Sequence, residues 1–174
     1  CHATIPEKVL SKIEPNILYE IQNEFNYCVK SWPFNLPKGF IHADIFPDNV
    51  FFHENEVSGF IDFYFSCTDI LAYDLAIAIN AWCFDNESIL NKEKYKYLLD
   101  GYNSQRKLST EEVFYLPLLC KAASIRFLLT RLYDWVHTPK DADVSPKNPI
   151  EYVNKLKHFK KVVKKINYEE ILPS

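Results

Sequence analysis

The strongest constraint on the fold of this chain is a set of polar residues spaced between short apolar segments, from Gly39 to Phe63. The apolar residues 39–41 predict a short strand. Pro47 follows soon after, and the strand must end before it because proline cannot take part in regular strand pairing. Asp44 is therefore expected on a tight loop at the edge of a rigid element, where functional side chains are commonly found.

A β-hairpin is predicted directly after this loop. Residues 50–53 and 56–61 are rich in Phe, Val and Ile, and the polar pair 54–55 between them is typical of a turn. Because a hairpin returns the chain to the place where it began, Asp62 at its end should lie beside Asn49 at its start.

Asp44, Asn49 and Asp62 together indicate phosphoryl transfer. That chemistry needs a carboxylate near the attacking hydroxyl and oxygen ligands that hold Mg²⁺ on the nucleotide phosphates. These residues supply both in the order and spacing of kinases with the protein-kinase-like fold. Asn49 and Asp62 are the expected metal ligands, because Mg²⁺ takes one or two protein oxygens and the rest from water and phosphate. Asp44 and His42 are the candidate catalytic residues, Asp44 as the proton acceptor and His42 as a brace for the loop. ATP and Mg²⁺ are the expected cofactors.

Each of these residues alone has an ordinary structural explanation. An Asp after a strand is commonly a turn or helix-cap residue, and the run 47–49 alone is a turn signal. His42 alone would more often be a buried, hydrogen-bonded histidine. The kinase interpretation rests on the combination, since the polar positions stand next to predicted strands at a set spacing.

Longer segments carry a more specific resemblance. The chain closely resembles homoserine kinases of the aminoglycoside-phosphotransferase-like type, from about Leu36 to about Leu156. The loop motif alone is shared with choline kinases and antibiotic kinases. The runs 63–65, 80–84 and 126–135 are more particular to the homoserine kinase branch. The resembling segments are residues 42–52, 58–65, 72–77, 80–84, 126–135 and 149–152.

This resemblance implies an α+β, mainly helical fold: the large C-terminal lobe of the protein-kinase-like, or aminoglycoside phosphotransferase, fold with short β-hairpins. It implies transfer of the γ-phosphoryl group of Mg-ATP to the hydroxyl of a small molecule, with L-homoserine, an acceptor in threonine biosynthesis, expected. Protein kinases have Gly two residues after the metal-binding Asp. Tyr64 stands there in this chain, which argues against a protein kinase. The resemblance also assigns Asp74 a structural role, bracing the catalytic loop through hydrogen bonds.

Tyr64, Arg126 and Arg131 are the candidate substrate-binding residues. An arginine could hold the carboxylate of an amino acid by a bidentate contact. The alternative is pairing within the helix, Arg131 with Asp134 three residues on. Spacing cannot choose between the arginines, but Arg126 is favoured because it has no acidic neighbour three or four residues away.

Residues that a complete kinase would need are absent from the sequence. It has three glycines, all far apart, so no Gly-rich loop can cover the ATP phosphates. No strand before Gly39 has a Val-Ala-Ile-Lys-like pattern to supply the phosphate-pairing lysine. The chain begins with Cys1 and contains no Met. We therefore expect residues 1–174 to form a single catalytic lobe, inactive alone, whose nucleotide-holding small lobe is missing. The face left uncovered should be apolar and prone to self-association.

Composition excludes several classes of partner. A net charge of −3 and a pI near 6.0 give no electrostatic footprint for nucleic acid. The five cysteines show no Cys-x-x-Cys spacing, which favours reduced thiols in a cytoplasmic protein. No apolar run was expected to reach the length of a membrane span, and the N-terminus does not resemble a signal peptide.

The remaining pattern predicts helices around the short strands. The helix after Asp62 should be capped by Thr68 or Asp69. A capping box at 109–112 should begin a long helix, bent near Pro117. The lysines from 155 to 165 should line a solvated helix face. The expected helices are about 7–30 with a break near Pro15, 70–84, 91–105, 110–137 and 149–167, with a loop over 138–148.

Two alternatives remain open at this stage. A kinase of the choline or aminosugar type would need an acidic or aromatic cage for a cation in place of an arginine clamp. A non-enzymatic interpretation makes this chain a catalytically inactive binding or assembly fragment.

Overall fold

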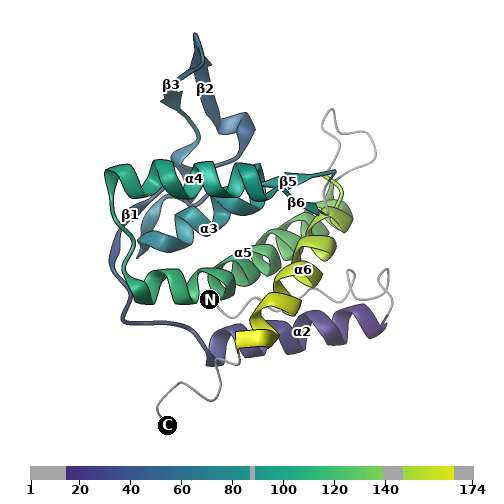
Figure 1. Cartoon of the computed structure of the whole chain (residues 1–174). Coiled ribbons are helices and arrows are strands. Elements are labelled where there is room, and N and C mark those ends of the chain that lie inside the picture. The colour runs from purple at the N-terminus through teal and green to yellow at the C-terminus, as the bar shows by residue number, and fades with distance from the viewer. Residues whose placement is uncertain (1–14, 87–88, 139–146, 167–174) are drawn as a thin grey trace.

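The computed structural model describes residues 15–86, 89–138 and 147–166. It has a body of packed helices from which one β-hairpin projects (Figure 1). The α+β, mainly helical fold expected from the sequence is confirmed. The helices are α2 (Pro15–Lys30), α3 (Leu71–Trp82), α4 (Lys92–Gln105), α5 (Thr110–His137) and α6 (Ile150–Ile166). The 3-10 helices are η1 (Pro47–Asn49) and η2 (Phe63–Phe65). The strands are β1 (Lys38–Ile41), β2 (Val50–His53), β3 (Glu56–Phe60), β4 (Cys67–Ile70), β5 (Phe84–Asp85) and β6 (Ile89–Leu90).

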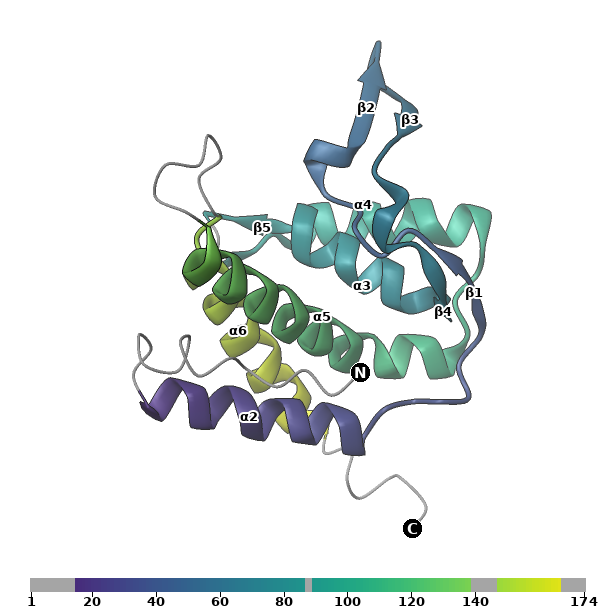
Figure 2. The ribbon, with the colours of Figure 1, turned by 180° about the vertical axis from the view of Figure 1, so that it is seen from behind.

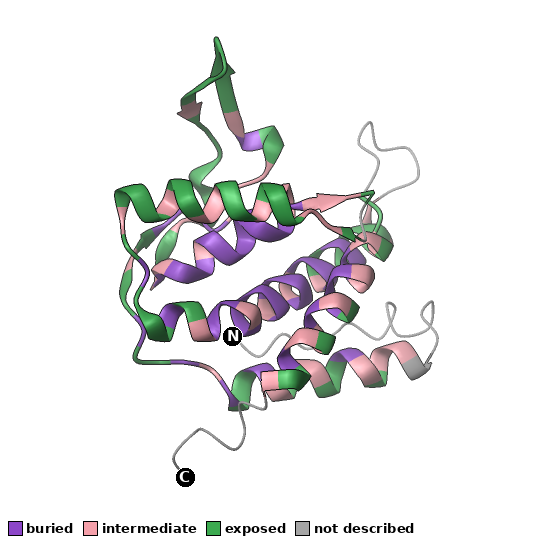
Figure 3. Ribbon diagram, in the orientation of Figure 1, coloured by how far each residue is buried: buried purple, intermediate pink, exposed green. Residues whose placement is uncertain are grey.

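Helix α5 is the centre of the core. It packs against α6, α3 and α2, and its inward surface and that of α3 are buried (Figure 3). The predicted capping box is confirmed: the Ser109 hydroxyl accepts from the Glu112 N–H, and the Glu112 carboxylate accepts from the Ser109 N–H. Pro117 lies inside the helix, which continues without a break.

By length and composition alone, α5 could cross a membrane, so the expectation that no apolar run is long enough was wrong. Of its most apolar window, 61% is buried inside the fold. The apolar residues serve as core contacts to the neighbouring helices, which explains the composition of α5 without a bilayer.

The described strands form three two-stranded antiparallel sheets. The predicted hairpin is confirmed as β2 and β3. Its turn residues Glu54 and Asn55 have φ of 49° and 68°, the geometry of a type I′ turn, whose twist matches that of paired strands. The short pair β5 and β6 was not predicted, because two-residue strands carry no periodic signal.

The segment before α3 differs from the prediction. Thr68 and Asp69 do not cap the helix but lie in β4, which pairs with β1 beside α3 (Figure 2). Strand pairing already uses the backbone of these residues, so α3 begins after Ile70 without a side-chain cap. Gly39 of β1 allows this packing, since a Cβ there would lie 2.8 Å from Cδ2 of Leu71.

Helix α6 corrects one further prediction. Lys155 does not lie on a solvated face, because only 2% of it is exposed. Its ammonium pairs with Glu151 one turn earlier and lies 4.5 Å from the centre of the Tyr152 ring. A buried lysine is tolerated here because an anion and an aromatic face replace its hydration.

The other boundaries lie close to those predicted. Asn91 caps α4 by accepting from the N–H groups of Glu93 and Lys94. The predicted helix over 7–14, the end of the last helix at 167 and most of the predicted loop lie outside the described residues. The cysteines in the described part of the chain, Cys28, Cys67, Cys83 and Cys120, are free thiols.

Candidate active site

The loop that carries Asp44 leaves β1 and reaches η1 through a strained residue. Ala43 has φ of 62°, a left-handed conformation that residues with a Cβ adopt at a free-energy cost. The Asp74 carboxylate on α3 accepts hydrogen bonds from the backbone N–H of His42 at 3.0 Å and of Ala43 at 2.8 Å. Asp74 therefore fixes the direction in which the loop leaves the strand.

His42 joins the two ends of the site. Its Nδ1 accepts from the backbone N–H of Asp44 at 3.2 Å, so the ring proton belongs on Nε2, which donates to the Ile61 carbonyl at 2.9 Å. The ring is 5% exposed and packs on Phe63, with 4.6 Å between ring centres. His42 thus ties the Asp44 loop to the residue before Asp62.

Asn49 holds Asp44 directly. Its Nδ2 donates to the Asp44 backbone carbonyl at 2.9 Å and to the carboxylate Oδ2 at 3.0 Å. The Asn49 carbonyl in turn accepts from the Ile61 N–H at 3.0 Å. The hairpin therefore brings its two ends together as its pattern predicts, and Asp62 follows immediately after this bond.

The electrostatics of the site make Asp44 a stronger base than an ordinary aspartate. Burial raises its pKa, and the nearby Asp62 charge raises it further. The positive charge of Arg126 and the hydrogen bond from Asn49 lower it, but the net shift is upward. A higher pKa favours proton transfer from a hydroxyl group.

A sequence profile of the phosphotransferase enzyme family, APH, matches residues 7–108. That range is more than half of the chain. The chain belongs to the phosphotransferase enzyme family. The match includes the Asp44 loop, the hairpin and Asp74, so the geometry described above lies within the part of the chain that defines membership.

Individual relatives extend the family match. The phosphotransferase chain is 50% identical over 151 residues to a homoserine kinase of Rhizobium etli, covering 87% of this chain and 47% of that protein. It is 49% identical over 150 residues to a homoserine kinase of Brucella anthropi, covering 86% and 46%. The chain thus spans about half the length of the curated relatives it matches. Among solved structures, it is similar to a Plasmodium vivax ethanolamine kinase with a TM-score of 0.60, at 20% identity over 95% of this chain and 45% of that one, which shows a shared fold.

The candidate site offers oxygen ligands suited to Mg²⁺. Because Nδ2 of Asn49 makes both bonds to Asp44, its Oδ1 remains as a possible ligand beside the Asp62 carboxylate. Within residues 15–86, 89–138 and 147–166, no group of three or more His, Cys, Asp or Glu side chains could hold a metal ion. Two protein oxygens fit an ion that takes its other ligands from phosphate and water.

The predicted substrate-binding residues have different partners in the structure. Arg126 reaches the Asp44 loop, where its Nη1 donates to the Ala43 carbonyl at 2.6 Å. Arg131 is buried, pairs with Glu151 of α6 and donates to the Asn148 carbonyl at 3.0 Å, so the alternative of pairing with Asp134 within the helix is not supported. The pairing of Arg131 with Glu151 depends on how α5 packs against α6. The spacing of Arg131 and Asp134 along one helix contains no information about that packing.

Tyr64 has a different environment from the two arginines. It lies in η2, two residues after Asp62, and is 85% exposed. Its ring makes an edge contact with Phe65, with 5.1 Å between ring centres. Its hydroxyl is therefore free to meet a ligand or another part of the protein beside the metal-ligand end of the hairpin.

Sequence reasoning missed two residues that support the catalytic loop. Trp82 of α3 donates its indole N–H to the Ile45 carbonyl at 2.9 Å. Lys147 pairs with Asp48 of η1 at 2.5 Å, across 99 positions of sequence. Trp82 lies in the run 80–84, which resembles homoserine kinases, and this resemblance could have indicated a role for the tryptophan. Nothing in the sequence linked Lys147 to the loop.

Proposed function

We propose that this chain is the catalytic lobe of an ATP-dependent kinase that phosphorylates the hydroxyl group of L-homoserine. The observation that carries the proposal is the convergence of Asp44, Asn49 and Asp62, held by the Asn49 bonds to Asp44 and by the pairing of the hairpin ends. Membership of the phosphotransferase family supports a kinase. The relatives named homoserine kinase support the acceptor.

In the proposed reaction, Asp44 accepts the proton of the acceptor hydroxyl as the hydroxyl oxygen attacks the γ-phosphorus of ATP, and the bond from that phosphorus to the bridging oxygen breaks to release ADP. Asn49 fixes the position of the carboxylate oxygen, and His42 keeps the Asp44 and Asp62 ends of the site at a constant separation. Asn49 Oδ1 and the Asp62 carboxylate would hold Mg²⁺, which when bound neutralises charge on the nucleotide phosphates. These roles require little movement, because the hydrogen bonds of the loop are already formed.

L-homoserine carries a carboxylate and an ammonium, which need partners. Arg131 is the weaker candidate for the carboxylate, since Glu151 and a backbone carbonyl already occupy its guanidinium. Arg126 has one Nη committed to the catalytic loop. Tyr64 has an exposed hydroxyl and could contact the acceptor from η2.

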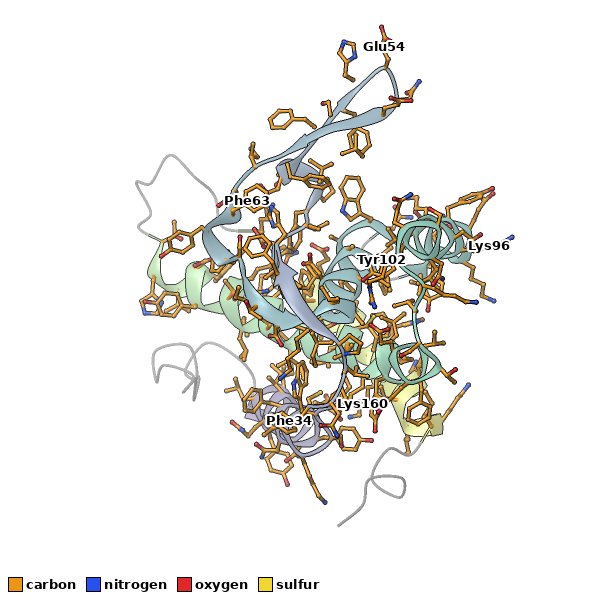
Figure 4. The ribbon with its side chains drawn as sticks, turned by 90° about the vertical axis from the view of Figure 1, so that its left-hand side faces the viewer. Phe34, Glu54, Phe63, Lys96, Tyr102 and Lys160 are labelled. Atoms are coloured by element: carbon orange, nitrogen blue, oxygen red, sulfur yellow. The ribbon has the colours of Figure 1, made fainter. Side chains whose placement is uncertain are left out.

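We also propose that the nucleotide-holding small lobe is not part of these 174 residues. The curated relatives are about twice as long, and several large apolar side chains of the hairpin and η2 are exposed. The hairpin residues are exposed over most of their length (Figure 3), and the hairpin extends from Phe63 near its base to Glu54 at its tip (Figure 4). The exposed apolar residues of this hairpin face are Phe51, Phe52, Val57, Phe60, Ile61, Phe63, Tyr64 and Phe65.

The hairpin face is the surface we expect the small lobe to cover, at least in part. In a preparation of this chain alone, the same face would favour self-association, because large exposed apolar patches mark interaction sites. Cytoplasmic localisation is part of the same proposal, since homoserine, ATP and reduced thiols are found together there.

A screen of acceptors tests the function. The protein that contains this chain would be incubated with Mg-ATP and, separately, homoserine, choline, ethanolamine and an aminoglycoside, and the phosphorylated product identified by mass spectrometry. Phosphorylation of homoserine with the highest kcat/KM is expected, and Asp44→Asn is the control for a contaminating kinase. If the protein phosphorylates choline but not homoserine, the proposed acceptor is wrong and only the assignment as a kinase is supported.

A further inference from the structure

The carbonyl and the N–H groups around Ala43 are held from opposite sides by two charged residues on different helices. Asp74 on α3 accepts from the N–H of His42 and of Ala43, and Arg126 on α5 donates to the Ala43 carbonyl at 2.6 Å. Ala43 is in a left-handed conformation. Such a conformation in a residue with a Cβ persists only where surrounding contacts impose it.

We propose that Arg126 is a positioning residue that forms, with Asp74, a clamp on the backbone of Ala43 and thereby directs the Asp44 carboxylate toward the acceptor hydroxyl. The proposal rests on the proposed kinase function for its kinetic consequences, but not for the clamp itself. It gives Arg126 a role different from the carboxylate clamp expected from the sequence.

The surroundings of Arg126 suit a fixed guanidinium. Its Cζ lies 4.6 Å from the centre of the Phe127 ring and 5.4 Å from that of Phe65. It also lies near the Tyr73 hydroxyl, whose pKa burial raises to about 12 while the charge of Arg126 lowers it. Aromatic faces on a planar cation restrict its rotation, so the hydrogen bond to Ala43 is made by a preorganised donor.

Phe65 gives the clamp a second connection. Phe65 is the last residue of η2, the short helix that begins directly after Asp62, while Ala43 directly precedes Asp44. Arg126 therefore contacts both the loop that ends in the proton acceptor and the segment that follows the predicted metal ligand. Arg126, a single side chain of α5, thus helps to fix the positions of the Asp44 and Asp62 carboxylates relative to each other.

The two roles of Arg126 predict different kinetics. If Arg126 held the acceptor carboxylate, Arg126→Lys and Arg126→Gln would raise KM for the acceptor. If it positions Asp44, both variants should lower kcat, since small displacements of a catalytic group cost up to about a hundredfold. KM for the acceptor and for ATP should then change less than about threefold, because neither substrate contacts Arg126 directly.

The experiment has one arm that needs no enzyme activity. In this chain, amide hydrogen exchange would be measured for the wild type, Arg126→Gln, Arg126→Lys and Lys96→Gln. Lys96 is an exposed lysine of α4, well away from the hairpin (Figure 4), and its variant removes one positive charge without touching the loop. We expect the exchange rates of the loop amides in Lys96→Gln to equal those of the wild type.

Amide hydrogen exchange measures the clamp itself. The N–H groups of His42 and Ala43, which bond to Asp74, should exchange at least tenfold faster in Arg126→Lys, since lysine keeps the charge but not the planar fork. Should Arg126→Gln fail to fold, this exchange and the kcat of Arg126→Lys still decide the question.

Two results would overturn the clamp. One is amide exchange in Arg126→Lys equal to that of the wild type. The other is a tenfold rise in acceptor KM at unchanged kcat, which would restore the carboxylate role. If the wild-type protein phosphorylates no acceptor, the proposed function fails, while hydrogen exchange still tests the clamp.

Discussion

The side-chain amide of Asn49 donates to the Oδ2 atom of Asp44 at 3.0 Å, so the proposed metal ligand also orients the proposed base. The same nitrogen donates to the Asp44 backbone carbonyl at 2.9 Å. Asn49 lies in η1, whose first residue, Pro47, has a fixed φ suited to a short helix. In the proposed site, one residue would therefore couple metal binding to the position of the carboxylate.

Asn49→Leu should lose both functions while keeping a similar volume. We expect kcat to fall at least a hundredfold and the Mg²⁺ concentration for half-maximal activity to rise, because a donor to Asp44 and an oxygen ligand disappear together. Asn49→Asp, which keeps an oxygen ligand but brings a like charge next to Asp44, should retain more Mg²⁺ affinity than activity. Titrations of rate against Mg²⁺ measure both; an unchanged Mg²⁺ requirement in Asn49→Leu would remove Asn49 from the metal site.

Asp44→Asn keeps the shape of the side chain and removes its charge and its capacity to accept a proton. A positioned general base contributes about 10²–10⁴ in rate, so we expect a loss of that order in kcat. KM for ATP should remain nearly unchanged, because Asp44 is not an expected metal ligand. Steady-state kinetics test this, and a variant that keeps more than about a tenth of the wild-type kcat contradicts the role.

The raised pKa of Asp44 predicts the pH dependence of the reaction. The carboxyl must be ionised to accept a proton, so activity should fall as pH decreases through its pKa. Because burial places that pKa above 3.8, the acidic limb should lie at a higher pH than for an ordinary aspartate. The profile of kcat/KM reports the free enzyme and is the appropriate measurement. A limb at or below 3.8 would show that the base is another group.

The local pattern of this sequence was sufficient to predict the hairpin geometry at the candidate site and much of the fold. The polar turn at Glu54 and Asn55 fixes the hairpin, and the hairpin alone brings Asp62 back to Asn49. The long helix was predictable because the capping box at Ser109 and a sustained apolar pattern agree. In each case the relevant contacts are close in sequence.

Contacts between distant segments were not predictable in the same way. Arg131 has a plausible partner three residues away, yet it pairs with Glu151 across 20 positions because α5 and α6 pack together. Thr68 and Asp69 have good capping side chains, but pairing with β1 uses their backbone instead. Local propensity describes the structure that a segment would favour alone. At these positions, tertiary packing imposes other partners.

The chain alone should bind Mg-ATP weakly. It offers two oxygen ligands for the metal, and its three separated glycines supply no loop to cover the phosphates. We expect no saturable binding at micromolar ATP in isothermal titration calorimetry and almost no ATP consumption. The longer protein that includes a small lobe should bind under the same conditions. Micromolar affinity in the 174-residue chain would mean that the nucleotide site is complete within it.

Glu151 provides a test of stability in the core. It is the anion between Arg131 and Lys155, both of which are buried. Glu151→Gln removes the carboxylate that Arg131 and Lys155 share, and breaking a buried pair in this way costs about 3–5 kcal/mol. Urea unfolding at pH 7 measures the change. Glu111→Gln is the matched control, because Glu111 is also an acidic residue in the first turn of a helix, where its loss costs about 0.3–1 kcal/mol.

The effect of Glu151→Gln should also depend on pH. Burial raises the pKa of Glu151, but its bonds to Lys155 and Arg131 outweigh this and hold the pKa below the ordinary value of 4.5. A depressed pKa means that the ionised carboxylate contributes stability above 4.5, and that this stability is lost as pH falls through the folded-state pKa. The difference in unfolding free energy between wild type and Glu151→Gln should therefore be constant from pH 6 to 8 and shrink below about 4.5. A difference that stays constant down to pH 3, or one no larger than that of Glu111→Gln at pH 7, would show that the buried triad does not stabilise the packing of α5 against α6.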